Sequence, residues 1–186
     1  MRISTTTLES YRLWRDPEQD WMSEDELIAT IKGEFRPNHN VLLGQAFGRV
    51  LEKPEAYRVR NGYLCGDFAF GEDVMEPALA VIDRRGVFEA KGTKPYGDRT
   101  VVAKADHLLG AHLSEFKTTL STFDFDKYAA SCQWRFMAEI FEPSLVTYHV
   151  FCLYEGTTGV VELRSIESFN LYPYAALHDD CCALVD

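Results

Sequence analysis

The sequence predicts a mixed α/β fold in which a central mixed β-sheet is flanked by helices. Segments with helical periodicity open the chain, strand-like segments follow, and a further helix precedes two long strands. Helices and strands do not alternate regularly, which argues against a succession of βαβ units. The chain has 186 residues and 46% hydrophobic content, and it contains no repeat or linker. These features predict one domain over residues 1–186.

Two helices are expected at the start of the chain. In STTTLESYRLW, Thr6 and Glu9 have the spacing of a capping box, and Pro17 is expected to close the helix. In SEDELIATIKGEF, Ser23 and Glu26 repeat this box. The side chains expected to face inward are Leu8, Tyr11 and Trp14 in the first helix and Leu27, Ile28 and Ile31 in the second.

The third helix, in NVLLGQAFGRVLEKP, has the clearest period. Asn40 is expected to cap it, and the helix should end just before Pro54. Gly44 and Gly48 lie four residues apart on one face, although glycine costs a helix interior about 1 kcal/mol relative to alanine. This cost suggests that another part of the protein approaches the helix backbone closely. The apolar stripe consists of Leu43, Phe47, Val50 and Leu51.

Strand signals dominate the middle and the end of the chain. Asn61-Gly62 predicts a two-residue hairpin turn, and a short helix is expected through VMEPALAVI. Residues 87–119 are rich in strand formers, with a loop expected at KGTKPYGD. One helix is expected through DFDKYAASCQWRFMAEIF, and two long strands joined at EGTTG follow it.

The segment KADHLLGAHLSEFK carries acids on both sides of an expected turn. If Gly110-Ala111 is a two-residue turn, Asp106 lies opposite Glu115 and Lys104 lies opposite Lys117. Like charges directly opposite each other are unfavourable, so a positive charge must offset the two acids. One interpretation is a solvent-exposed face on which the lysines form weak ion pairs with the acids. The other interpretation is a metal site.

Apolar residues on both faces of this hairpin favour the metal site, because they predict a sheet that is at least partly covered. The face of the acids also carries Val102, Leu108 and Leu113, and the other face carries Ala103, Ala105 and Phe116. Two carboxylates in such a place suit a hard divalent cation such as Mg²⁺, which takes oxygen ligands and keeps waters. Lys117, on the same face as the acids, could position or deprotonate an attacking water, or stabilise charge on a phosphate.

The hairpin carries Asp106, then eight intervening residues, then Glu115-Phe116-Lys117. This pattern resembles the core motif of the PD-(D/E)XK nuclease superfamily. Members of this superfamily bind a metal with such acids and hydrolyse a phosphodiester bond. Three further segments resemble its RecB-like and phage-exonuclease-like branch, in the right order: STTTLESYRLW, GQAFGRVLE and YAASCQWRFM. The resemblance covers residues 4–137.

The resemblance implies a restriction-endonuclease-like core and a metal-dependent deoxyribonuclease of the phage or RecB-like recombination type, with an exonuclease favoured over an endonuclease. It implies Mg²⁺, with Mn²⁺ as a substitute, held by the two strand acids with Glu52 and the Phe116 backbone carbonyl. Gln133 would contact the DNA or organise the site. Arg58 and Arg60 are candidates for contacts with DNA phosphates.

Two positions depart from the pattern of this branch. Many members carry a metal-binding histidine where this chain has Gly48, and a tyrosine where it has Met137. Together with the net charge of -10, these departures favour an alternative function. In that alternative, a nuclease fold with weakened catalysis acts as a binding protein, an inhibitor or an accessory subunit. An unrelated ligand-binding α/β domain is a third hypothesis.

The composition also bears on the surroundings of the protein. The chain contains no run of about 18 apolar residues, and its start lacks the apolar stretch of a signal peptide. We therefore expect no membrane contact and a cytoplasmic location. The five scattered cysteines favour free thiols in a reducing compartment. DNA is the expected substrate, and a protein partner in recombination or an oligomer is compatible with the resemblance.

Overall fold

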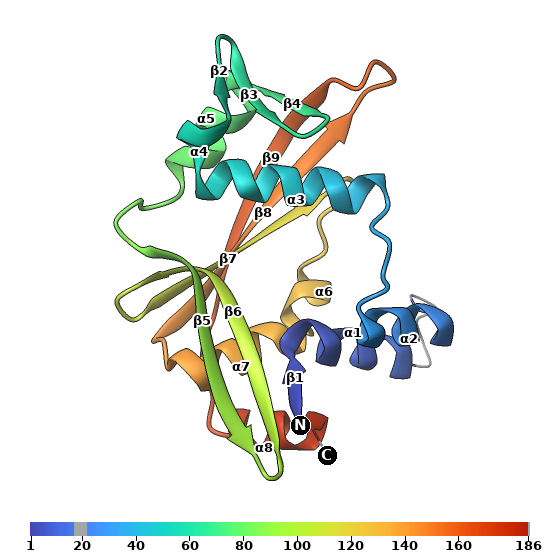
Figure 1. Cartoon of the computed structure of the whole chain (residues 1–186). Coiled ribbons are helices and arrows are strands. Elements are labelled where there is room, and N and C mark those ends of the chain that lie inside the picture. Colours follow the sequence, from blue (N-terminus) through green and yellow to red (C-terminus); the bar gives the residue numbers. More distant parts are fainter. Residues whose placement is uncertain (17–21, 186) are drawn as a thin grey trace.

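A mixed β-sheet with helices on both of its faces forms the centre of the computed structural model, which describes residues 1–16 and 22–185 (Figure 1). The strands of this large sheet are β1 (Arg2–Ser4), β5 (Val87–Tyr96), β6 (Arg99–Leu109), β7 (His112–Thr119), β8 (Leu145–Glu155) and β9 (Val161–Leu171). Within the described residues they follow the order β1-β6-β7-β8-β9, with β5 paired to β6. The β1–β6 and β7–β8 pairs are parallel, and the others are antiparallel. This arrangement confirms the predicted mixed α/β fold.

A smaller sheet and the helices complete the fold. The smaller sheet consists of β2 (Arg58–Val59), β3 (Gly62–Cys65) and β4 (Phe68–Gly71). The helices are α1 (Thr5–Arg15), α2 (Glu24–Lys32), α3 (His39–Glu52), α4 (Pro54–Tyr57), α5 (Glu72–Ala80), α6 (Phe125–Ala129), α7 (Cys132–Phe141) and α8 (Leu177–Val185). Among the described residues, none of these helices has the length and apolar character needed to cross a membrane.

Two apolar clusters hold the helices against opposite faces of the large sheet. The division is clearest in β8, because successive side chains of a strand point to opposite faces. Val146, Tyr148 and Val150 belong to the cluster that includes α1, α7 and α8. Phe151 and Leu153 belong to the other, which includes α3, α5 and the smaller sheet. The strands that carry the predicted acids therefore lie between two layers of helices.

The first helix is confirmed, but its cap differs from the prediction. α1 begins after Ser4, whose hydroxyl oxygen accepts a 3.0 Å hydrogen bond from the N–H of Thr7. The expected capping box at Thr6 and Glu9 is therefore wrong, and Glu9 is left for another contact. The helix ends at Arg15, and the residue expected to close it, Pro17, lies outside the described residues.

The next two helices are also confirmed, with one change of cap. The capping box of Ser23 and Glu26 is present at the start of α2. α3 begins after Asn38, whose side-chain oxygen accepts a 3.0 Å hydrogen bond from the N–H of Val41. The expected cap at Asn40 is therefore wrong by two positions.

The predicted apolar stripes differ in how well they are buried. In α3 all four residues are buried, whereas in α1 and α2 only Leu8 and Leu27 are. The exposed fractions of the other four residues, contrary to the prediction, are 37% for Tyr11, 40% for Trp14, 39% for Ile28 and 60% for Ile31. Periodicity identified the helices, but it did not show which face of α1 and α2 packs against the rest of the protein.

The predicted hairpin in the smaller sheet is present, with its turn shifted by one residue. Val59 pairs with Gly62, so the turn consists of Arg60 and Asn61 rather than Asn61-Gly62. Gly62 lies in β3, where a Cβ atom would come within 2.3 Å of the Phe70 carbonyl oxygen. The glycine therefore permits the close approach of β4 instead of forming the turn.

Three further boundaries differ from the prediction. β5 runs through the expected loop KGTKPYGD as far as Tyr96. Pro95 is tolerated there because β5 is an edge strand, paired only with β6 among the described residues. The single helix expected around residues 124–141 is divided into α6 and α7, because Ser131 caps the second helix. α8 was not predicted, whereas α5 and the long strands β8 and β9 are confirmed.

The two glycines of α3 give a test of how closely this helix packs on β7. A Cβ atom at Gly44 would lie 2.5 Å from Thr118 Oγ1, whereas one at Gly48 would meet no described atom within 4 Å. We expect Gly48→Ala to raise the free energy of unfolding by about 0.5 to 1 kcal/mol, and Gly44→Ala to lower it by about 1 kcal/mol or more. Urea unfolding measures both, and Thr118→Ala should rescue Gly44→Ala. Equal gains from both glycine variants would contradict the close contact.

Candidate active site

The candidate active site lies where β6 and β7 separate. Next to the turn the strands pair as predicted, from Leu109 opposite His112 to His107 opposite Ser114. Beyond this point β7 continues beside β8, and β1 lies beside the first residues of β6. The predicted ladder therefore ends early, and among the described residues it lacks two expected pairs, Asp106 with Glu115 and Lys104 with Lys117.

The Asp106 side chain replaces the missing ladder contact between the strands. Its Oδ2 accepts a 2.8 Å hydrogen bond from the backbone N–H of Phe116. This bond holds the carboxylate close to Glu115, although the two residues are not ladder partners. Lys104 is engaged elsewhere, because its ammonium forms an ion pair with Glu89 of β5.

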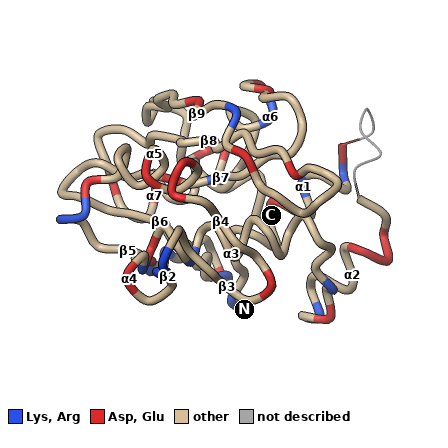
Figure 2. The backbone as a smooth tube through the Cα atoms, turned by 90° about the horizontal axis from the view of Figure 1, so that it is seen from above, with Lys and Arg blue, Asp and Glu red and all other residues tan. Residues whose placement is uncertain are grey.

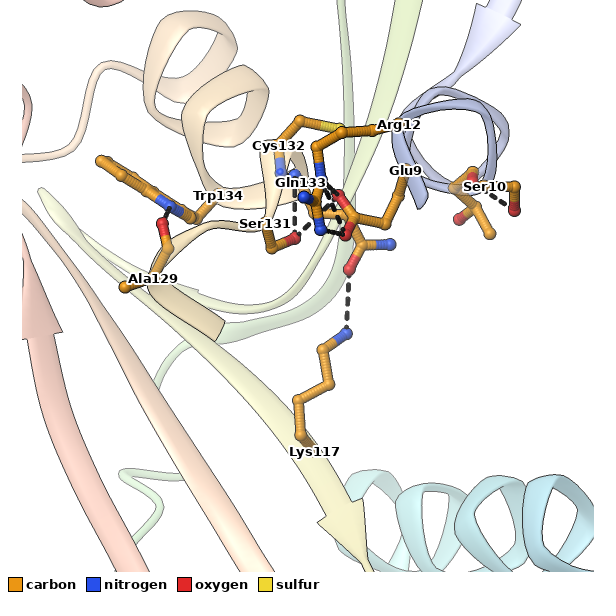
Figure 3. A network of polar contacts seen from close by, with 10 residues as sticks. Glu9, Ser10, Arg12, Lys117, Ala129, Ser131, Cys132, Gln133 and Trp134 are labelled. Carbon is orange, nitrogen blue, oxygen red and sulfur yellow. Dashed lines mark hydrogen bonds and ion pairs between the residues drawn. The ribbon is translucent and has the colours of Figure 1, made fainter. Parts of the chain in front are cut away.

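A partly buried chain of polar contacts links β7 to α7. Lys117 Nζ donates to Glu115 Oε1 at 2.6 Å and to Gln133 Oε1 at 3.1 Å, and Figure 3 shows Lys117 extending from β7 toward Gln133. The Glu115 side chain is only 6% exposed. The interpretation of this hairpin as a solvent-exposed face with weak ion pairs is therefore wrong, and the structure brings four predicted residues together: Asp106, Glu115, Lys117 and Gln133.

The charged groups of the site shift one another's pKa values. Burial, followed by the nearby charge of Glu115, raises the pKa of Asp106 to about 7, because both disfavour the ionised form. Burial by itself would lower the pKa of Lys117, but the surrounding groups, led by Glu115, together outweigh this effect and raise that pKa. Lys117 therefore remains positively charged at neutral pH, whereas Asp106 exchanges its proton near neutrality.

Two buried oxygens of this site lack a partner within the described part of the chain. Among the described residues, the buried Glu115 Oε2 and the buried Tyr148 hydroxyl each lack a hydrogen bond. Glu115 and Tyr148 are register partners on the parallel strands β7 and β8, so their side chains lie on the same face of the sheet. Burying an oxygen without a hydrogen-bond partner costs free energy. The carboxylate oxygen Glu115 Oε2 is therefore an acceptor available to a cation or a bound water.

A cavity of about 950 Å³ lies between α3 and the strands of the site. Asp106 and Lys117 line it from the sheet, and Gly44, Gly48 and Glu52 line it from α3. The two glycines thus face this cavity and the sheet beyond it. Gly48 in particular leaves its part of the cavity open, because no described atom fills the place of a Cβ.

The oxygen donors fit a magnesium-type cation only in part. The described residues contain no group of three or more His, Cys, Asp or Glu side chains arranged to hold a metal ion. Mg²⁺ is usually bound through one or two carboxylates and keeps several waters, so Asp106, Glu115 and the Phe116 carbonyl stay predicted ligands. Glu52 lines the same cavity, with its carboxylate 3.0 Å from Lys53 Nζ. Its role as a further ligand stays a prediction.

The two predicted DNA-contacting arginines lie apart from this cavity. Arg58 belongs to β2, and Arg60 follows in the turn of the same hairpin. Neither is among the described residues that line the cavity. Arg58 donates to Glu76 at 2.7 Å and to Glu72 at 2.9 Å, so its charge is already paired. Contacts of Arg58 and Arg60 with DNA stay predictions.

Sequence reasoning missed Glu9 and Tyr148 as residues of the site. Glu9 Oε2 accepts a 2.7 Å hydrogen bond from the N–H of Cys132, the residue before Gln133. Tyr148 lies beside Glu115, as described above. Neither role has a local signal, because Glu9 contacts a residue 123 positions away and Tyr148 has the sequence setting of an ordinary core residue.

Comparisons with known proteins agree on the fold. No family model and no curated protein matches the sequence. The structure of the protein SSO0001 aligns with a TM-score of 0.52 at 12% identity, covering 99% of this chain and 72% of SSO0001. The structure of an exonuclease candidate from Eubacterium rectale aligns with a TM-score of 0.56 at 10% identity, covering 99% of this chain and 77% of that protein.

A third solved structure, LHK-Exo in complex with dAMP, aligns with a TM-score of 0.48 at 11% identity, covering 98% of this chain and 85% of LHK-Exo. The first two alignments show that this chain shares their fold along almost its whole length. At such low identity the similarity concerns the fold alone, so the chemistry has to be argued from the residues of the site.

The raised pKa of Asp106 predicts how stability depends on pH. Because this pKa is about 7 in the folded protein and about 3.9 in the unfolded chain, the folded state binds the extra proton between these values. The contribution of Asp106 to stability is thus fully present below about pH 4 and is lost as the pH rises through about 7. Without divalent cations, we expect Asp106→Asn to gain stability relative to wild type by about 1.4 kcal/mol per pH unit across this window.

Urea unfolding in chelator-containing buffers between about pH 4 and pH 8 measures this difference. Asp98→Asn is the matched control, because the Asp98 side chain is 93% exposed at the turn between β5 and β6. A difference between Asp106→Asn and wild type that stays constant over the whole pH range would contradict the raised pKa.

Proposed function

We propose that this chain hydrolyses DNA phosphodiester bonds with the help of a divalent cation, as an exonuclease of the phage or RecB-like recombination type. One observation carries the proposal: the partly buried chain of contacts from Glu115 through Lys117 to Gln133 lies beside Asp106 at the wall of a cavity. This is the combination of acids and lysine that the sequence motif predicts. The fold shared with an exonuclease candidate supports the proposal.

Each residue has a role that follows from its place. Asp106, Glu115 and the Phe116 carbonyl would hold Mg²⁺ or Mn²⁺, with Glu52 as a further acid on the cavity wall. Such a cation would lower the pKa of a bound water and offset the charge of the phosphate. The Lys117 ammonium, held by Glu115 and Gln133, would orient the attacking water and stabilise the negative charge that develops on the phosphate. In this role Gln133 acts on the lysine, and a contact with DNA remains a separate prediction.

A second function is favoured by the distribution of charge. Several basic side chains are already engaged in ion pairs, among them Arg58, Arg85 and Lys94. Figure 2 shows acidic positions interspersed with basic ones along the backbone, including the stretch around α4 and β2. A nuclease fold with weakened catalysis that binds another protein, as an inhibitor or an accessory subunit, would need no continuous basic path for DNA. A protein partner and an oligomer belong to this proposal as well.

A cleavage assay separates the two functions. Purified protein is incubated with end-labelled linear duplex and single-stranded DNA in Mg²⁺, Mn²⁺ or EDTA. We expect degradation that depends on the metal, and a loss of about 100-fold or more in Asp106→Ala and Lys117→Ala. Circular DNA of the same sequence should survive, because an exonuclease needs a free end.

Asp98→Ala and Lys32→Ala are the matched controls, because they remove the same charges from a turn and from α2. Both should retain wild-type activity. Circular dichroism should show that all four variants are folded. A folded wild-type protein that leaves every substrate intact in either metal would sink the nuclease proposal and leave the binding protein.

A further inference from the structure

Glu9 lies at the centre of a polar network between α1 and the start of α7 (Figure 3). Its Oε2 accepts hydrogen bonds of 2.7 Å from the N–H of Cys132 and 3.1 Å from the hydroxyl of Ser131. Arg12, one turn further along α1, donates from Nη2 to Oε1 at 2.7 Å. The Glu9 side chain is 16% exposed. A carboxylate of α1 thus satisfies the first free N–H group of another helix, where its negative charge is also favoured by the helix dipole.

The charge of Glu9 is maintained despite its burial. Burial by itself would raise the pKa of Glu9, but hydrogen bonds from Arg12 and Cys132 outweigh this effect and lower the pKa. Hydrogen bonds with a charged partner are about twice as strong as neutral ones. Glu9 therefore fixes the first turn of α7 more firmly than Ser131, the neutral cap of the same helix, could do alone.

The first turn of α7 carries the residue that holds the proposed catalytic lysine. Gln133 directly follows Cys132, and its side-chain oxygen accepts the 3.1 Å hydrogen bond from Lys117 Nζ. The contacts therefore form one continuous path from Arg12 through Glu9 and the start of α7 to Lys117. A shift of this turn would move Gln133 relative to Lys117.

We infer that Glu9 is a positioning residue, which orients Lys117 by fixing the first turn of α7 and thereby the side chain of Gln133. The effect of Glu9 on DNA cleavage rests on the proposed function. Its effect on the geometry of Lys117 does not. The two can be measured separately, because the reactivity of an amine can be followed without any DNA.

The test uses Glu9→Ala, which removes the contact, and Glu9→Gln, which keeps an oxygen acceptor but removes the charge. Glu26→Ala is the matched control. Glu26 is also a glutamate at the start of a helix, where it accepts a 2.8 Å hydrogen bond from the N–H of Ser23, but it belongs to the capping box of α2. Both alanine variants lose a capping contact, and only one of them lies on the path to Lys117.

The first measurement is the acetylation rate of Lys117 in the folded protein, followed by peptide mass spectrometry. We expect Glu9→Ala to raise this rate several-fold, because Lys117 loses the hold of Gln133, with Glu9→Gln intermediate and Glu26→Ala unchanged. Gln133→Ala should raise the rate as well. The double variant Glu9→Ala/Gln133→Ala should react no faster than Gln133→Ala, because the two residues act through one contact.

The second measurement is DNA cleavage. We expect Glu9→Ala to lower kcat by about tenfold or more with little change in KM, because the lysine is misplaced while the cavity is intact. Unchanged Lys117 acetylation in both Glu9 variants, with a loss of stability like that of Glu26→Ala, would reduce Glu9 to a helix cap. An inactive wild type with the expected acetylation pattern would overturn the proposed function and leave the positioning role intact. If Glu9→Ala does not fold, the acetylation rate of Lys117 in Glu9→Gln alone tests the positioning role.

Discussion

The ion pair between Lys117 and Glu115 is the interaction on which the rest of the site depends. It lies at the place where β6 and β7 separate, and it gives two neighbouring carboxylates a positive partner inside the protein. The Glu115 side chain is almost fully buried whereas that of Lys117 is 30% exposed, so the ion pair gives the buried carboxylate a partner that reaches the surface. The buried Glu115 carboxylate therefore favours an inward orientation of Lys117, and this orientation also brings the ammonium to Gln133. Lys117 thus both offsets the negative charge of Glu115 and supplies the ammonium that the proposed chemistry uses.

Two helices approach this ion pair from opposite faces of the sheet, and each depends on a small structural detail. On one face, α3 comes so close to β7 at Gly44 that a Cβ atom would overlap Thr118, and one turn later Gly48 leaves the cavity open. On the other face, α7 brings Gln133 to Lys117 because Glu9 and Ser131 satisfy its first N–H groups. The open cavity and the fixed lysine at its wall follow from these two contacts. Neither contact is visible in the hairpin that carries the acids.

The features that the sequence predicted are those set by local patterns. The turn at Gly110-Ala111 and the pairing next to it follow from residues within a few positions of one another, and the stripe of α3 follows from its period. The separation of β6 and β7 could not be predicted in this way, because it depends on where β1 and β8 pair. Glu9 shows the same limit: its spacing from Thr6 fits a local capping box, yet its carboxylate caps a helix 123 residues away. Gln133 was identified through a family resemblance and not through any pattern of its own.

The charges of the site are compatible with both proposed functions. With a pKa of about 7, Asp106 is close to half protonated at neutral pH, and a cation that takes this carboxylate as a ligand must displace its proton. Protons and the proposed cation would therefore compete for Asp106, and the affinity for that cation would rise as the pH rises toward 8 and above. Glu115 forms its ion pair with Lys117 in this structure without a cation. In the proposed nuclease, a cation would give the site its catalytic charge distribution by displacing the proton of Asp106, whereas the proposed binding protein would keep that proton.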